Sequence, residues 1–344
     1  MRSRARVPSL TFPRTAAVTL AAITTRPAGE AVEGQGLMRI VVNGQQAFGA
    51  AVLDALLEGG EDVVAVYCAP DEPGGPPDPL AEAAREAGIL LRQPDSFETK
   101  SAAAELAALR PDLMVMAFVT LFVPEPVLNT PTHGSIQYHP SLLPRHRGPS
   151  AINWAIIQGD PKTGVAIFWP DEGLDTGPVL MLREVEIAPD DTLGSLYFEK
   201  LFPRGVEAMV ESVDLVREGR APKLVQDDAQ ATYESWCRKA DVEIDWSRPV
   251  ADVYNLIRGA NPQPGAWTTV GSEQVEVLDS DRVEGDSGAS PGQVATVDDD
   301  RLVVAAGGGA VAIRVVRAGG EKVAARDYAR AAGVEPGAHL GGGE

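Results

Sequence analysis

The strongest constraint on the fold is a regular alternation of apolar, strand-like runs and helical stretches that begins at Met38. The short runs are rich in β-branched residues, and the stretches between them have the apolar spacing of helices. Repeated strand-helix-strand units predict a parallel sheet covered by helices. The predicted strands are residues 39–43, 62–67, 112–117, 135–138, 163–169 and 178–187, and the predicted helices are 45–58, 79–87, 100–109, 149–159 (with Ser150 as N-cap) and 193–216.

A second domain is expected where the chain changes character beyond Pro222. Residues 271–301 hold nine acidic residues and two arginines, in short alternating runs separated by Gly, Ser and Asp. Such runs predict a small antiparallel β-domain. Its predicted elements are a helix at 251–257, strands at 275–278 and 302–305, a last strand at 311–316 and a last helix at 324–332. The expected divisions are a first domain at 38–221, a linker at 222–232, the β-domain at 233–335 and a tail at 336–344.

Residues 1–37 stand apart, with five arginines and no acidic residue before Glu30. An Arg-rich, acid-poor leader is typical of a transit peptide. The alternative is a start assigned too far upstream, because Met38 opens the first strand. We prefer the second interpretation.

The charge and cysteine content restrict the partners and the compartment. A formal net charge of -19 makes the chain a poor general binder of nucleic acid or anionic membrane. Two cysteines, Cys68 and Cys237, are too few for a disulfide framework or a zinc site, so we expect a reducing, cytoplasmic compartment and no metal. No segment approaches the roughly 18 to 20 apolar residues of a transmembrane helix.

The candidate chemistry lies in residues 133–148, which contain three of the four histidines. His139 follows the strand 135–138, and Pro140 turns the chain there, so we expect the imidazole to face a cleft at a strand end. Downstream, Asp175 lies in a glycine-bracketed acidic turn. A histidine and an aspartate on two strand-end loops suit general acid–base chemistry. The alternative is a loop whose histidines are ordinary surface residues.

The glycines of the first strand-helix turn do not indicate a nucleotide site. Gly44 and Gly49 lack the GxGxxG spacing, and no Lys-Ser/Thr pair follows them. They more simply permit a tight turn.

Residues 139–144, His-Pro-Ser-Leu-Leu-Pro, followed by Asp175 within Gly-Leu-Asp-Thr-Gly, resemble the enzymes that use 10-formyltetrahydrofolate. With Arg-His-Arg-Gly-Pro-Ser-Ala-Ile-Asn-Trp at 145–154, the chain is most similar to the hydrolase domain of 10-formyltetrahydrofolate dehydrogenases, and next to methionyl-tRNA formyltransferases. The resemblance runs from Met38 to about Trp267. It implies an α/β fold with an N-terminal Rossmann-like parallel sheet (the formyltransferase fold) and a small C-terminal β-rich, OB-like domain.

Carried over residue by residue, the resemblance implies that His139 is the catalytic histidine and Asp175 its acidic partner. It implies 10-formyltetrahydrofolate as formyl donor, in a pocket that includes Leu121, Phe122, Val123 and Asp175. Attack on a formyl group creates an oxyanion that needs positioned donors, and His139 can supply one. A carboxylate that holds a water can shuttle the proton. Without the motif, the three apolar residues would be assigned to core packing.

Gln137 is a departure from the family pattern. Transferases of this family usually place Asn two residues before the histidine, and the hydrolase domain has an apolar residue there. Gln keeps the amide one methylene further out, so it could donate to the oxyanion or be directed away from it. Gln137 is therefore a third candidate catalytic residue.

The formyl acceptor is expected to be a small amine or water. Methionyl-tRNA formyltransferases carry a basic insertion after the second strand, whereas residues 71–78 here contain no Lys or Arg. With the net charge, this disfavours tRNA, although residues 257–262 remain compatible with it. Two alternatives stay open: a methionyl-tRNA formyltransferase acting on initiator tRNA, and a folate-binding protein without turnover.

Overall fold

The computed structural model describes residues 37–285 and 287–341, which form two compact units. The first unit contains residues 37–139, 165–183 and 202–227, and the second contains the described residues of 140–164, 184–201 and 228–341. Of the leader or misassigned start predicted at residues 1–37, all but Leu37 lies outside the described residues, and the domain boundaries remain predictions. Within the described ranges, no helix combines the length and apolarity needed to cross a membrane.

A seven-stranded sheet has the strand order β3-β2-β1-β4-β5-β6-β7. The strands are β1 (Arg39–Gly44), β2 (Asp62–Tyr67), β3 (Leu91–Arg92), β4 (Leu113–Ala117), β5 (Ser135–His139), β6 (Lys162–Phe168) and β7 (Val179–Glu186). β1, β2, β4 and β5 are parallel, as predicted, and the unpredicted β3 is parallel to β2, but β6 runs antiparallel to β5. The sheet is therefore mixed, because a buried apolar run identifies a strand without giving its direction.

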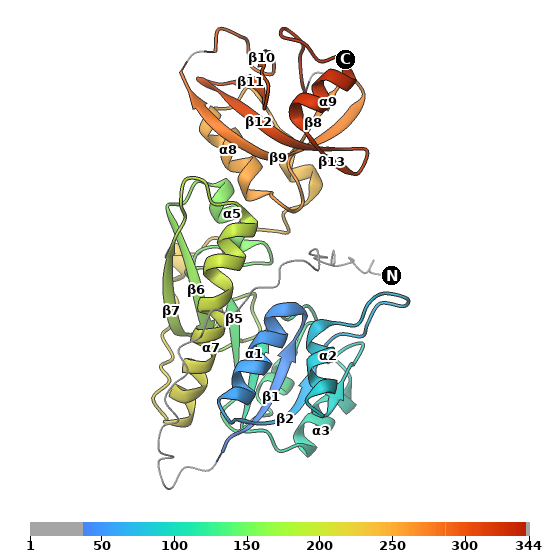
Figure 1. The fold of residues 1–344 in the computed structure, drawn as a ribbon. Coiled ribbons are helices and arrows are strands. Elements are labelled where there is room, and N and C mark those ends of the chain that lie inside the picture. The colour runs from blue at the N-terminus through green and yellow to red at the C-terminus, as the bar shows by residue number, and fades with distance from the viewer. Residues whose placement is uncertain (1–36, 286, 342–344) are drawn as a thin grey trace. The chain divides into compact units, whose positions relative to one another are not determined.

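Helices cover both faces of this sheet in the first unit (Figure 1). On one face, α1 (Gln46–Glu58) and α7 (Phe202–Arg217) bring Phe48 onto Tyr138 of β5, with ring centroids 4.2 Å apart. α2 (Pro79–Glu86) packs against α1. On the other face, α3 (Lys100–Ala108) and α4 (Glu125–Leu128) close a core with Val41, Met114 and Met116. Because side chains alternate along a strand, the neighbours of Tyr138 in β5 face α3 and α4.

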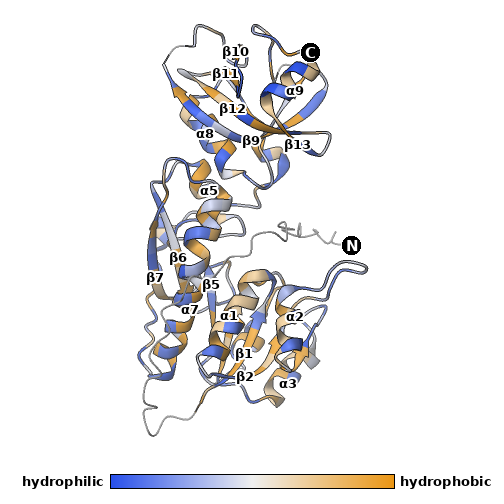
Figure 2. Ribbon diagram, viewed as in Figure 1, coloured by the Kyte–Doolittle hydropathy of each residue, from blue (hydrophilic) through white to orange (hydrophobic). Residues whose placement is uncertain are grey.

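The predicted long helix 193–216 is interrupted. It consists of α6 (Leu193–Ser195), a π-helix (Leu196–Leu201) and α7, and α7 alternates hydrophobic and hydrophilic residues along its length (Figure 2). Pro203 accounts for the interruption, since it has no N–H to donate to the preceding turn, and helices often widen to a π-turn at such points.

Ser150 is the N-cap residue of α5 (Ala151–Ile157), as predicted, but its side chain makes no capping hydrogen bond to the first turn. Its Oγ instead accepts a hydrogen bond of 3.0 Å from the backbone N–H of Cys237, 87 residues further on. A partner so distant is not visible in the local sequence.

The C-terminal part of the second unit confirms the predicted antiparallel β-domain. β8 (Trp267–Val270), β9 (Glu273–Glu284), β10 (Val294–Val297), β11 (Leu302–Ala306), β12 (Gly309–Ala318) and β13 (Glu321–Ala324) form a six-stranded sheet. The printed pairings are all antiparallel. α8 (Val250–Gly259) and α9 (Ala325–Ala332) pack on its core through Val253, Ile257 and Tyr328. β13 follows the strand predicted as the last, and it was missed because it is only four residues long.

Candidate active site

The site residues predicted from sequence gather at the carboxyl ends of the central strands of the first unit. The chain builds β1, β2 and β3 outward and then returns to place β4 on the other side of β1, so the strand order reverses between β1 and β4. Ligands of open α/β sheets bind outside the strand ends at such a switch point. β5, which ends at His139, is the next strand after β4.

His139 and Asp175 meet, although 36 residues separate them in the sequence. Nδ1 of His139 lies 3.6 Å from Oδ2 of Asp175. The two residues are only 5% and 7% exposed. The distance is long for a hydrogen bond, but catalytic contacts are often long without substrate. The carboxylate faces Nδ1 and so holds the imidazole ring of His139 in one orientation.

The turn that carries Asp175 is built by its acidic and glycine residues. Oδ1 of Asp171 accepts hydrogen bonds from the backbone N–H of Gly173, at 3.0 Å, and from Oγ1 of Thr176, at 2.6 Å. Gly177 is required because a Cβ there would lie 1.8 Å from the carbonyl oxygen of Trp169. Asp175 itself adopts a left-handed φ of 55°, which Asp tolerates better than most residues.

Gln226 is a residue of the site that sequence reasoning missed. Its Nε2 donates to the backbone oxygens of Asp175, at 2.9 Å, and Gly177, at 2.7 Å, and the residue is buried. Nearby, Val179 and Leu224 exchange backbone hydrogen bonds of 2.8 and 2.9 Å. Residues 222–226, predicted as part of a linker, thus support the catalytic turn. No sequence signal marks a single glutamine 51 positions after Asp175.

The three residues predicted for the folate pocket have different environments. Val123 is 7% exposed and belongs to the core beneath α3 and α4, where Leu121 packs at its edge. Phe122 is 63% exposed, and Leu174, next to Asp175, is 56% exposed. Exposed large apolar side chains of this kind can pack against a flat aromatic ring. The residues predicted for the pocket are therefore compatible in chemistry with a folate.

Gln137 lies on the same face of β5 as His139, two residues before it. In register it pairs with Met116 of β4, which in turn pairs with Asn43 of β1. Within the described ranges, the side chain of Gln137 makes no hydrogen bond, and Nδ2 of the buried Asn43 has no partner. Two amides thus stand in one row near the strand ends.

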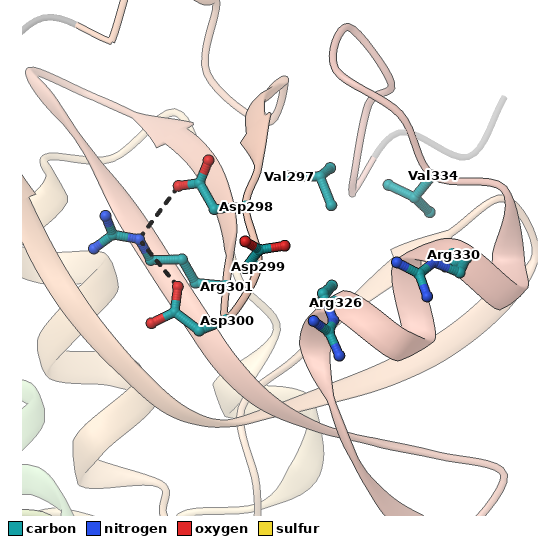
Figure 3. Close-up of a pocket in the computed structure, with 8 residues that line it drawn as sticks. All are labelled: Val297, Asp298, Asp299, Asp300, Arg301, Arg326, Arg330 and Val334. Atoms are coloured by element: carbon teal, nitrogen blue, oxygen red, sulfur yellow. Dashed lines mark hydrogen bonds and ion pairs between the residues drawn. The ribbon is translucent and has the colours of Figure 1, made fainter.

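A hollow of about 520 Å³ lies in the C-terminal β-domain and is separate from these residues. Figure 3 shows Arg326 and Arg330 reaching into it from α9, with Asp298 and Asp300 turned toward Arg301. Its lining is mostly charged and offers no aromatic wall. We therefore place the candidate active site at His139 and Asp175, which form a buried His–Asp contact, and not in this hollow.

Comparisons with known proteins agree with this architecture. The family model described as formyl transferase matches residues 38–213, and the model described as formyl transferase, C-terminal domain, matches residues 237–333. HypX from Aquifex aeolicus, solved in complex with tetrahydrofolic acid, shares the fold with a TM-score of 0.62 and 21% identity. That likeness covers 86% of this chain and 47% of the HypX chain.

Two curated relatives are more similar in sequence. The cytosolic 10-formyltetrahydrofolate dehydrogenase of Xenopus tropicalis is 44% identical over 248 residues, or 71% of this chain. The match spans only 27% of the length of that dehydrogenase. The methionyl-tRNA formyltransferase of Marinobacter nauticus is 39% identical over 290 residues, which are 83% of this chain and 93% of that protein. As its motifs predict, the chain belongs to the formyl transferase family of enzymes.

Proposed function

We propose that this protein transfers the formyl group of 10-formyltetrahydrofolate to a small amine or to water and releases tetrahydrofolate. The observation that carries the proposal is the buried contact of 3.6 Å between His139 and Asp175 at the end of β5. The 44% identity to a 10-formyltetrahydrofolate dehydrogenase supports the choice of donor. The exposed Phe122 supplies an apolar surface for the folate ring.

In this proposal some catalytic residues stabilise the developing negative charge and another transfers the proton. His139 donates a hydrogen bond to the formyl oxygen as negative charge develops there, and the amide of Gln137 is positioned to add a second donor. Asp175 holds His139 and accepts, through a water, the proton that the attacking amine or water loses. The new bond forms first and gives the oxyanion, whose collapse then breaks the C–N bond to the folate, and the folate nitrogen takes up that proton.

The charge of the chain supports a small acceptor. Residues 237–333 contain 15 acidic and 11 basic residues, and the whole chain carries -19. The loop at residues 71–78 contains three acidic residues and no Lys or Arg. Binding of tRNA relies on basic residues that neutralise phosphates. Water or a small amine makes no such demand.

Methionyl-tRNA formyltransferase is the second candidate, and a specific observation favours it. The relative from Marinobacter nauticus matches over 93% of its own length. The two family models together span both parts of this chain, residues 38–213 and 237–333. The similarity to a methionyl-tRNA formyltransferase therefore extends over nearly the whole length of that relative.

Release of tetrahydrofolate from 10-formyltetrahydrofolate by the full chain separates these candidates. It is measured in buffer alone, with charged initiator tRNA, and with a panel of small amines and amino sugars, each at several salt concentrations. We expect release in buffer or with one amine, with little dependence on salt. Release only with tRNA, falling steeply as salt rises, would establish the second candidate. Binding of folate without release of tetrahydrofolate under any of these conditions would indicate a folate-binding protein without turnover.

A further inference from the structure

The turn between β1 and α1 lies at the sheet's switch point and is held firmly against β4. A Cβ at Gly44 would lie 2.0 Å from the carbonyl oxygen of Ala117, so only glycine fits there. The backbone N–H of Gln45 donates to that same oxygen at 3.1 Å, and the side chains of Gln45 and Thr120 hydrogen-bond to each other. The first turn of α1 therefore has a fixed place at the sheet edge that also carries His139.

The start of a helix at such a switch point is the usual place for a ligand's phosphate, because its N–H groups point outward and its dipole favours an anion. In this protein a carboxylate of the chain occupies the position. The backbone N–H of Gln46, the first residue of α1, lies 3.0 Å from each carboxylate oxygen of Asp78. Oδ1 of Asp78 also accepts a hydrogen bond of 2.9 Å from the backbone N–H of Leu80 in α2.

Asp78 lies outside α1 but accepts a hydrogen bond from the first residue of that helix. The first turn of α1, all of it described, contains no acidic residue, and Gln45 makes no side-chain cap. Asp78 is 32 residues further along and only 9% exposed, so its carboxylate is a built part of this turn and not a passing surface contact. It supplies the negative group that α1 otherwise lacks.

The loop at residues 71–78 is folded so as to hold Asp78 in place. Oδ1 of Asp71 accepts a hydrogen bond of 2.9 Å from the backbone N–H of Asp78. The carboxylate of Asp71 also forms an ion pair of 3.4 Å with Arg85 of α2. Burial raises the pKa of Asp78, and the nearby charge of Asp71 adds to the effect. Because this position already disfavours the negative charge of Asp78, it would disfavour the binding of a second anion still more.

We infer that Asp78 determines acceptor specificity by occupying the anion position at the start of α1, so that the acceptor is water or an amine without a phosphate group. This inference rests on the proposed formyl transfer and deepens it. An acceptor anchored by phosphate would have to displace a buried carboxylate that has three backbone hydrogen-bond contacts. The acidic loop that replaces a basic insertion thus acts at the site itself, beyond its contribution to net charge.

Inorganic phosphate and pyrophosphate are the probes for this inference. We expect neither to inhibit tetrahydrofolate release by the wild-type enzyme across the millimolar range. In Asp78→Asn the anion position loses its charge, and we expect competitive inhibition, with an apparent constant roughly tenfold or more tighter than in wild type. Glu72→Gln is the matched control, since Glu72 is an exposed residue of the same loop, and it should behave as wild type. Competitive inhibition of wild type and Asp78→Asn with the same constant would overturn the inference.

Calorimetric titration of phosphate into the folate-free protein gives a readout that needs no turnover. Asp78→Ser keeps a side-chain oxygen for the cap of α2, so it tests the same point if Asp78→Asn does not fold. Binding by either variant and not by wild type supports the inference, even if tetrahydrofolate release is never observed and the proposed function is wrong. Equal binding to wild type, or preferred formylation of a phosphate-bearing amine by wild type, contradicts it.

Discussion

At the scale of single residues, the proposed chemistry depends on how firmly Asp175 is held in its left-handed conformation. The side-chain amide of Gln226 donates two hydrogen bonds to backbone oxygens of that turn. Asp171 stabilises the same turn from within the loop. The carboxylate that faces His139 is therefore positioned by Asp171 and Gln226 through the backbone of its turn.

Gln226→Ala tests this support. Removing both hydrogen bonds leaves two backbone oxygens without their partner, which costs about 1–3 kcal/mol of stability. Because Asp175 then loses its fixed position, we expect kcat for tetrahydrofolate release to fall about tenfold or more, since misplaced catalytic groups lose rate steeply. The measurements are steady-state kinetics and urea unfolding.

The control for that experiment is Gln274→Ala, which removes an exposed glutamine from β9. It should leave kcat unchanged. A loss of stability in Gln226→Ala with kcat and KM both at wild-type values would show that Gln226 serves the fold alone.

The functional residues that could be predicted from the sequence are those that lie within a short, recognisable motif. His139 and Asp175 each stand in a short, characteristic segment, and the structure brings them together. Gln226 and Asp78 could not be found this way, because their partners lie 51 and 32 positions away and follow from tertiary packing. Hydrogen bonds at such separations leave no periodic or compositional pattern.

At the scale of secondary structure, the packing of α7 on β5 sets the position of the strand that ends at His139. Gly205 is the close-contact point: a Cβ there would lie 2.7 Å from Cε2 of Tyr138 and 2.8 Å from Cε2 of Phe48. The two rings are stacked, so neither moves without disturbing the other.

Gly205→Ala should therefore destabilise the first unit. Overpacking costs about 1–3 kcal/mol. Replacing Gly with Ala inside a helix returns about 1 kcal/mol. We expect a net loss, seen as a lower urea midpoint with an unchanged m-value. Glu207→Ala, on the exposed side of α7, is the control and should change the midpoint little. A Gly205→Ala variant more stable than wild type would contradict this view of the interface.

Element prediction succeeded where the local signals were strong and failed where an element is very short or interrupted. The limits of β2 and the start of α2 were predicted to the residue, because β-branched runs and an Asp-Pro helix start are strong local signals. β3, with two residues, and α4, with four, are too short to show a period. The direction of β6 depends on how the chain returns to the sheet, which no local pattern contains.

At the scale of the whole molecule, each compact unit carries one cysteine that reports on its folded state. Burial raises the pKa of the Cys68 thiol in the first unit and of the Cys237 thiol in the second unit to about 12, from an ordinary value of 9.0. Because the thiol form is favoured in the folded protein, the contribution to stability is complete below pH 9 and is lost as the pH rises from 9 toward 12.

Alkylation by iodoacetamide measures this protection. At pH 8 only roughly one thiol in 10⁴ is ionised at a pKa near 12, so we expect native protein to react about 100-fold or more slowly than protein in urea. The native rate should rise about tenfold per pH unit from pH 8 to 11. Mass spectrometry after digestion assigns the label to each cysteine. Rapid labelling of Cys68 in native protein at pH 8 would contradict the burial of that thiol in the first unit, and rapid labelling of the partly buried Cys237 would contradict the raised pKa of its thiol.

The central claim is that His139 carries out formyl transfer from 10-formyltetrahydrofolate, and one comparison tests it most directly. Tetrahydrofolate release and tetrahydrofolate binding are measured for wild type, His139→Ala and His133→Ala. His133 is an exposed histidine six residues earlier and serves as the matched control. We predict that His139→Ala loses about 100-fold or more of kcat while folate affinity changes little, and that His133→Ala retains both. Full turnover by His139→Ala would remove the histidine from the mechanism and contradict the account.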